Sequence, residues 1–265
     1  MSGDESHMRA KLAGQDVSIA YGDRRIVENL DLLVPERRFT ALVGPNGSGK
    51  STILRTFAGL MAPSCGSIFL DGRSIATLGT REMARRVGVL LQGPVAPEGL
   101  TVRDLVQQGR YPHRSLFGRW SEADQAACDE ALMLTGMTTL ADTPLDTLSG
   151  GQRQRAWIAM TLAQQGEVLL LDEPTTYLDL AHQVELMDLI TVLVRDHRKT
   201  VVAVLHDLNQ AARYAEHIVL LKGGTISAAG RPSDVISQEA IADVFGVRSI
   251  VIRDPVAGTP LCIPL

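Results

Sequence analysis

The chain has 265 residues, of which 45% are hydrophobic and 21% charged, and its 26 Lys and Arg against 30 Asp and Glu leave a formal net charge of −4. This apolar content excludes a disordered chain, and the slightly acidic balance gives no electrostatic reason to expect nucleic acid as a partner. The three cysteines lie far apart and form no CxxC pair, so neither a disulfide framework nor a zinc site is predicted.

Short apolar runs predict strands in the first third of the chain. They lie at residues 16–20, 39–43, 66–70 and 87–91. Asp71-Gly72 follows the third run and is typical of a tight hairpin turn. The apolar runs stay well short of the roughly 18–20 residues that a membrane-spanning helix needs, so we expect no such helix.

The pattern changes to helix between residues 102 and 147. Ser121, with Asp124 three residues later, is typical of a helix N-cap. We therefore predict a helical insert in this part of the chain.

From residue 150 onwards helices and strands alternate. Helices are predicted to about residue 165 and at 180–196, strands at 168–171 and 200–205, and a terminal hairpin at 249–253 and 261–263. Strands that are apolar throughout and alternate with helices predict a mainly parallel sheet covered on both faces.

Residues 44–51 read GPNGSGKS, directly after the apolar run 41–43 and before a helical stretch at 52–60. This is the context of the G-x-x-x-x-G-K-[ST] motif, in which backbone N–H groups curve around phosphate oxygens at a helix N-terminus. Lys50 is predicted to reach the β- and γ-phosphates and Ser51 to bind Mg²⁺. The predicted nucleotide-binding residues are Gly44, Pro45, Asn46, Gly47, Ser48, Gly49, Lys50, Ser51 and Thr52.

Two acids, Asp172 and Glu173, follow the apolar strand 168–171. An acid at the carboxyl end of such a strand lies in the ligand crevice of an α/β sheet. In isolation the pair could be an exposed acidic turn. Downstream of a phosphate loop, Asp172 is predicted to hold Mg²⁺ and Glu173 to polarise the attacking water as a general base.

A second anion-binding helix start is predicted at Leu148-Ser149-Gly150-Gly151-Gln152, with Ser149 as N-cap. It lies about a hundred residues from the phosphate loop, and one nucleotide has only one γ-phosphate. Either the chain binds two anions, or this helix end completes a site on another copy.

The LSGGQ string, with the phosphate loop upstream of it, resembles the signature of the ATP-binding cassette (ABC) ATPases. The resemblance implies an α/β P-loop NTPase fold, the ABC cassette, with a mainly parallel RecA-like core sheet, an N-terminal antiparallel β-subdomain and a helical insert. It also implies a head-to-tail pair that binds ATP and Mg²⁺ between its two copies. The residues implied to act in trans are Ser149, Gly150, Gly151, Gln152 and Asp179.

Three further residues match elements of this family. Tyr21 resembles the aromatic that stacks on adenine, Gln92 the glutamine that senses Mg²⁺ and γ-phosphate, and His206 the switch histidine; without the other motifs, Tyr21 would be a half-buried tyrosine and His206 structural. The resemblance implies that the catalytic residues are Glu173, His206, Lys50 and Gln92. It also implies that the Mg²⁺ ligands are Ser51, Gln92 and Asp172. Tyr177-Leu178-Asp179 resembles the loop that crosses the dimer, although many members carry a small residue at the position of Tyr177.

The cassette is predicted to be a single nucleotide-binding domain over residues 10–265. Residues 10–92 and 155–265 are expected to form the ATPase core and 93–154 the helical signature subdomain, with 1–9 as a polar extension. The 96 residues between Ser51 and Leu148 carry no sustained heptads, which excludes the coiled-coil ABC ATPases of chromosome maintenance.

Finer resemblance, at residues 109–113, 157–160, 175–180 and 206–211, is to the ATPase subunits of bacterial ferric-siderophore importers. The tail at 254–260 is most similar to the ferric enterobactin type. The alternatives are a haem or cobalamin importer ATPase, a non-transport ABC ATPase acting as a regulatory switch, and a P-loop kinase or GTPase. A GTPase is disfavoured because the sequence lacks the Asn-Lys-x-Asp guanine-binding motif and because this class does not explain residues 148–152.

The implied partners are a second copy, a polytopic membrane permease and, indirectly, a siderophore-binding protein, with no nucleic acid. The implied location is peripheral, on the cytoplasmic side of the inner membrane. The helical insert also carries a basic group that is either a solvated face or part of the groove for the permease's coupling helix: Arg103, Arg110, His113, Arg114 and Arg119.

Overall fold

The computed structural model describes residues 10–114 and 119–265; the expected polar extension at 1–9 lies outside the described residues. Its centre is a six-stranded sheet of order β10-β9-β3-β8-β7-β6. The strands are β3 (Phe39–Val43), β6 (Val87–Leu90), β7 (Val168–Asp172), β8 (Thr200–Val204), β9 (His217–Lys222) and β10 (Thr225–Gly230). All are parallel except β10, which pairs antiparallel with β9 at the edge. The mainly parallel core sheet is therefore confirmed.

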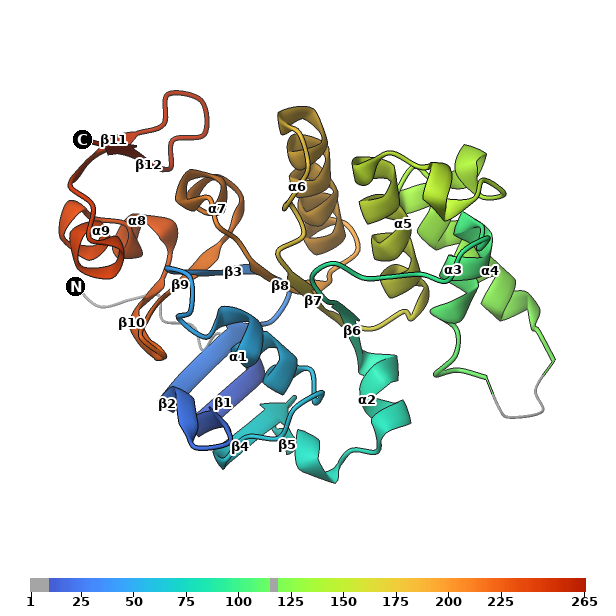
Figure 1. Cartoon of the computed structure of the whole chain (residues 1–265), viewed down its shortest axis with the longest axis horizontal. Helices are drawn as coiled ribbons and strands as arrows, with labels where there is room; N and C mark the ends of the chain where they lie inside the picture. Colours follow the sequence, from blue (N-terminus) through green and yellow to red (C-terminus); the bar gives the residue numbers. More distant parts are fainter. Residues whose placement is uncertain (1–9, 115–118) are drawn as a thin grey trace.

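Every residue of β3, β7 and β8 is buried, because helices cover both faces of this sheet. Successive side chains enter two separate cores. In β7, Leu169 and Leu171 pack with α5 (Gly150–Ala163), α6 (Leu180–Arg195) and α7 (Leu208–Tyr214), whereas Val168 and Leu170 pack with α1 (Lys50–Phe57). Figure 1 shows α5, α6 and α7 on one side of the sheet and α1 on the other.

A second, antiparallel sheet has the order β2-β1-β4-β5. It consists of β1 (Ala10–Tyr21), β2 (Arg24–Pro35), β4 (Cys65–Leu70) and β5 (Arg73–Ser74). Asp71 and Gly72 join β4 to β5 with φ of 51° and 75°, the left-handed pair that a two-residue hairpin turn requires. The sheet rests on α1, where a Cβ at Gly14 would lie 2.8 Å from the Phe57 ring.

The helical insert lies at one end of the molecule (Figure 1). Its helices α3 (Val102–Gln108) and α4 (Glu122–Leu134) pack against α5. The short 3₁₀ turns η2 (Thr138–Leu140) and η3 (Leu145–Thr147) connect α4 to α5 along the chain. Ser121 caps α4 in a capping box with Asp124, as predicted. The turn η1 (Ile75–Thr77) and helix α2 (Thr80–Arg86) lead from the second sheet into β6.

The opposite end carries α8 (Pro232–Val235), α9 (Gln238–Phe245) and a hairpin of β11 (Ser249–Arg253) and β12 (Pro260–Pro264). This confirms the predicted terminal hairpin. Strands β2, β9 and β10 were not predicted. Within the described residues, the helices are too short or too polar to cross a membrane.

Candidate functional site

The phosphate loop connects β3 to α1 in a conformation that needs glycine. A Cβ at Gly44 would lie 2.2 Å from the carbonyl oxygen of Leu221, and Gly49, the N-cap of α1, has φ of 93°. The Lys50 side chain is 5% exposed and folds back over the loop, donating hydrogen bonds to the carbonyl oxygens of Gly44 at 2.8 Å and Pro45 at 2.9 Å. Burial lowers the pKa of this ammonium group, which the charges of Glu173 and Asp172 partly oppose.

Asp172 ends β7 directly beneath this loop. Ser51 Oγ donates a hydrogen bond of 2.7 Å to Asp172 Oδ1. The buried Oδ2 atom makes no hydrogen bond among the described residues, and the Arg55 guanidinium is 3.9 Å away. Burial raises the pKa of the Asp172 carboxyl, against the opposing effects of Ser51 and Arg55.

These donors fit Mg²⁺. A hydroxyl and a carboxylate lie within hydrogen-bond distance of each other, and among the described residues the carboxylate keeps one buried oxygen without a hydrogen-bond partner. Mg²⁺ binds oxygen ligands and is held by one or two carboxylates together with substrate phosphates. Among the described residues, no group of three or more His, Cys, Asp or Glu side chains could hold a metal ion by itself.

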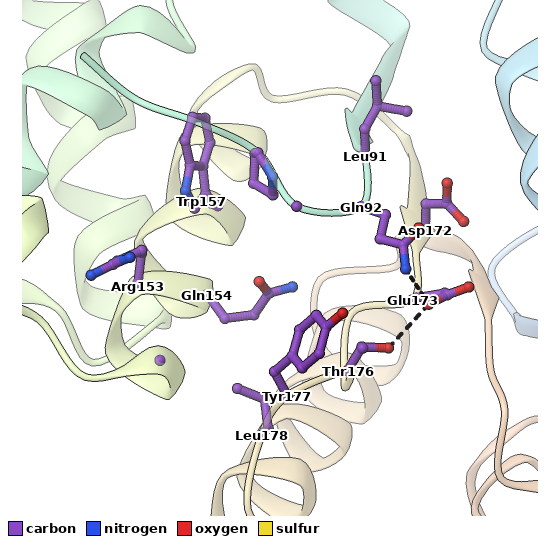
Figure 2. A pocket seen from close by; sticks show the side chains of 13 residues that line it. Leu91, Gln92, Arg153, Gln154, Trp157, Asp172, Glu173, Thr176, Tyr177 and Leu178 are labelled. Carbon is purple, nitrogen blue, oxygen red and sulfur yellow. Dashed lines mark hydrogen bonds between the residues drawn. The ribbon is translucent and has the colours of Figure 1, made fainter.

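Glu173 is the centre of a small polar network. Gln92 Nε2 donates a hydrogen bond of 2.6 Å to Glu173 Oε2, and His206 Nε2 lies 2.8 Å from Oε1. Thr176 Oγ1 also donates to Oε2, at 3.2 Å (Figure 2). The Glu173 backbone has φ of 52°, a left-handed conformation that is uncommon for this residue type and concentrates at functional sites. The structure thus brings Gln92, Glu173 and His206 together from three different strand ends.

A pocket of about 260 Å³ lies over the phosphate loop. Its lining residues are Arg24, Ile26, Asn46, Gly47, Gly49, Lys50, Ser51, Thr52 and Glu173. Arg24 and Ile26 were not predicted and carry no sequence signal for this role. They reach the pocket because the β1–β2 hairpin folds over the loop, and Tyr21, 50% exposed, pairs with Arg24 in that hairpin. Tyr21 itself does not line this pocket, so its predicted contact with adenine remains a prediction.

The LSGGQ segment opens α5 as predicted. Ser149 Oγ accepts a hydrogen bond from the Gln152 amide, and Gln152 Oε1 accepts one from the Ser149 amide. A Cβ at Gly151 would lie 2.4 Å from the ring of His182. Asp179 caps α6 by accepting the His182 amide at 2.9 Å, so the start of α5 and the start of α6 lie side by side in one chain.

The candidate residues fall into two groups, which we call the phosphate-loop surface and the signature surface. The phosphate-loop surface consists of residues 44–52 with Gln92, Asp172, Glu173 and His206. The signature surface consists of residues 149–152 with Asp179 and His182. Among the described residues, none of the signature surface lines the phosphate-loop pocket.

A hollow of about 230 Å³ lies where the two surfaces meet: Gly150 of the signature surface lines it together with Gln92, Asp172 and Glu173 of the phosphate-loop surface. Arg153, Gln154 and Trp157 of α5 also line it. In Figure 2, the Gln154 side chain points across it toward Gln92 and Glu173. Tyr177, 93% exposed with φ of 65°, stands at its edge. Gln92 and Glu173 therefore touch the space beside α5, whereas the phosphate loop faces its own pocket.

The predicted basic surface needs a correction at Arg110. Its side chain is 4% exposed, and its Nε donates to Asp124 Oδ1 at 2.9 Å. Its Nη1 donates to the carbonyl oxygen of Ala163 and to Gln165 Oε1. Arg110 thus ties the insert to the end of α5 from inside the protein. It is neither a solvated residue nor part of a docking surface.

The other basic residues lie nearer the surface. Arg103 pairs with Asp142 at 2.9 Å, and Arg114 lies over the Trp120 ring at 5.6 Å. His113 Nε2 lies 2.8 Å from the carbonyl oxygen of Gln164, and Arg119 is exposed. Their predicted contact with a permease remains a prediction.

A mainly parallel sheet with a glycine-rich loop around a buried lysine after β3, and with an Asp-Glu pair at the end of β7, defines a P-loop nucleoside triphosphatase. The sequence profile of ABC transporters matches residues 27–176, more than half of the chain. The chain belongs to the ABC transporter family, as an ATP-binding cassette that hydrolyses ATP.

Three known proteins show how far the similarity extends. The ferric enterobactin transport ATP-binding protein FepC of Escherichia coli K12 is 50% identical over 256 residues, covering 97% of this chain and 94% of its own. A structure described as an inward-facing metal-chelate type ABC transporter is 27% identical, with a TM-score of 0.84 over 97% of this chain and 98% of its own. A dimeric bacterial ABC transporter cassette, MJ0796, is 29% identical, with a TM-score of 0.73 over 83% of this chain and 98% of its own.

Proposed function

We propose that this chain is the ATP-hydrolysing motor subunit of a bacterial importer for iron(III)-siderophore complexes, working as a head-to-tail pair on a separate membrane permease. The observation that carries the paired mechanism is that, among the described residues, none of the signature surface lines the phosphate-loop pocket of the same chain. The cargo class is supported by 50% identity to a subunit named for ferric enterobactin transport.

The phosphate-loop surface would hold one ATP. Loop amides and the N-terminus of α1 would bind phosphate oxygens, Lys50 would leave its carbonyl partners for the β- and γ-phosphates, and Tyr21 would cover the adenine. Mg²⁺ would be held by Ser51 and Asp172 with Gln92 nearby, and it would supply positive charge at the β- and γ-phosphates.

Glu173 is the proposed general base. The attacking water bonds to the γ-phosphorus while the bond between that phosphorus and the β–γ bridging oxygen breaks, leaving ADP. The proton of the water passes to Glu173. Gln92 and His206, on opposite oxygens of Glu173, hold the carboxylate in place and face the γ-phosphate.

The second copy would complete each site. Its residues Ser149, Gly150, Gly151, Gln152 and Asp179 would contact the γ-phosphate side of the nucleotide. Because Asp179 and the start of α5 already lie side by side, they can meet the opposite nucleotide as one unit. ATP then has higher affinity for the closed pair than for the open one, which lets its binding drive closure.

Closure would reach the permease through Gln92 and the helical insert, with the cassette peripheral on the cytoplasmic side of the inner membrane. Hydrolysis would reopen the pair. The division into a core at 10–92 and 155–265 and a signature subdomain at 93–154 is part of this proposal, because the two parts must rotate relative to each other.

Size-exclusion chromatography with light scattering tests the pairing. Wild type and Glu173→Gln are each run with and without MgATP. We expect an ATP-dependent shift to dimer in the variant, because it binds ATP and cannot hydrolyse it. A protein that stays monomeric while wild type hydrolyses ATP would overturn the shared site.

Uptake of iron-55 bound to siderophores tests the cargo. A strain lacking the gene is complemented with wild type or Glu173→Gln, and uptake of labelled cobalamin and haem is measured in parallel. Restored siderophore uptake by wild type alone supports the proposal. Restored cobalamin or haem uptake would select the alternative importer, and normal uptake of all three in the deletion strain would favour a regulatory switch.

A further inference from the structure

The C-terminal hairpin is fastened to α7, the helix that follows the switch histidine. Asn209 Nδ2 donates a hydrogen bond of 3.0 Å to the carbonyl oxygen of Cys262, and the Cys262 amide donates one of 2.7 Å to Asn209 Oδ1. A carboxamide that pairs with both backbone groups of one residue imitates a neighbouring strand. Asn209 thereby satisfies the outer edge of β12.

This contact lies three residues from His206. On the other side of His206, Leu205 is fully buried and its amide donates to the carbonyl oxygen of Leu42 at 3.1 Å. Asp207 caps α7 by accepting the amides of Asn209 and Gln210. His206 therefore stands between two anchors, the core sheet before it and the start of α7 after it.

The second anchor depends on the hairpin. Cys262 is buried in the same core as Ala211 and Ala212 of α7. The hairpin thus holds α7 through a backbone-like pair and apolar packing.

We propose that Asn209 is a positioning residue for hydrolysis, through which the C-terminal hairpin sets the place of His206 against Glu173. This inference rests on the proposed ATPase mechanism. The His206 side chain is 46% exposed, so its position relative to Glu173 depends on where its backbone is held. A shift of about 1 Å in such a group is enough to slow a reaction severely.

The test is a kinetic cycle of Asn209→Ala, His206→Ala and the double variant, with Gln210→Ala as the control on the same helical turn. We expect Asn209→Ala to lower kcat about tenfold and to leave the KM and Kd for MgATP within about twofold, because the nucleotide pocket is untouched. Asn209→Ala should add no further loss to His206→Ala, since both act through one group. Gln210→Ala should hydrolyse ATP like wild type.

Three results would overturn the positioning role: full kcat in Asn209→Ala, a loss that multiplies with that of His206→Ala, or full kcat in His206→Ala. If Asn209→Ala does not fold, Asn209→Asp replaces it. Asp keeps the acceptor for the Cys262 amide and loses the donor to the Cys262 carbonyl, so the same drop in kcat is expected. Lack of MgATP hydrolysis by wild type would overturn the proposed function itself, whereas the results above leave it standing.

Discussion

The phosphate-loop surface and the signature surface satisfy their polar groups in different ways. On the phosphate-loop surface, Ser48 Oγ and Asp172 Oδ2 are buried without a hydrogen-bond partner among the described residues. On the signature surface, the capping box of α5 and the Asp179 cap of α6 are complete within the chain. Two buried polar atoms of the first surface thus lack a hydrogen-bond partner among the described residues, whereas the helix caps of the second surface are satisfied within the chain. This difference supports the proposal that hydrolysis takes place at the first surface and that the second contacts the nucleotide of a neighbouring copy.

The substitution Glu173→Gln should have the largest effect on the function of the phosphate-loop surface. We expect ATP hydrolysis to fall by about 10²- to 10⁴-fold, the usual contribution of a positioned general base. Binding of MgATP, measured by calorimetry, should persist, because Gln keeps the size of Glu173 and its contact with Gln92. Normal turnover would remove Glu173 as the base.

Arg110→Ala should loosen the attachment of the helical insert to the C-terminal end of α5. Removing one partner of a buried ion pair typically costs about 3–5 kcal/mol, because Asp124 would keep an uncompensated charge. Chemical denaturation should show this loss, with MgATP affinity retained in the folded fraction. Arg103→Ala, whose partner Asp142 is exposed, is the matched control and should cost about 1 kcal/mol or less. Equal costs for the two variants would contradict the structural role of Arg110.

Ser149→Ala separates capping from nucleotide contact. Ser121→Ala is its control, because both serines cap a helix in a capping box and each loss should cost about 1 kcal/mol of stability. Only Ser149→Ala should also lower ATP hydrolysis, by about tenfold or more, since it would remove the hydrogen bond to a charged phosphate that the proposed pair requires. Similar turnover in the two variants would remove Ser149 from the shared site.

Asp172→Asn should give a small, pH-dependent gain in stability without nucleotide. Burial raises the pKa of Asp172 above its unfolded value, so the folded state binds this proton more tightly, and wild type loses stability as pH rises through the raised pKa. The melting temperature of the variant should exceed that of wild type increasingly between pH 4 and pH 7, by about 2 °C for each kcal/mol. Stabilisation by MgATP should be lost. A difference in melting temperature that shrinks as the pH rises would contradict the raised pKa of Asp172.

Much of the fold follows from local signals. The run at 39–43 coincides with β3, and β7 and β8 differ from prediction by one residue each, because strands buried on both faces are apolar throughout. Strand β2 was missed because half of its residues are exposed, and four of these are charged. Strands β9 and β10 did carry a signal, since Gly223 and Gly224 join them with φ of 53° and 85°, the pair typical of a two-residue hairpin.

The site was predictable where spacing along the chain carries the chemistry, as for Lys50 and Ser51. It was not predictable where a residue's position depends on contacts between segments that are distant in the sequence. Arg110 finds Asp124 only when α3 and α4 pack together, and Arg24 reaches the pocket only when the β1–β2 hairpin folds over the loop. The contact of Asn209 with Cys262 spans 53 residues and depends on the packing of α7 against the hairpin.

The most direct test of the shared site mixes two inactive variants, Glu173→Gln and Ser149→Arg. Each variant alone places the same defect in both sites of its dimer. A mixed dimer has one intact site, in which Glu173 of one chain meets Ser149 of the other. ATP hydrolysis by the mixture should clearly exceed the sum of the separate activities, approaching about a quarter of wild type if the chains pair at random. A mixture no more active than that sum would contradict the head-to-tail sharing of sites.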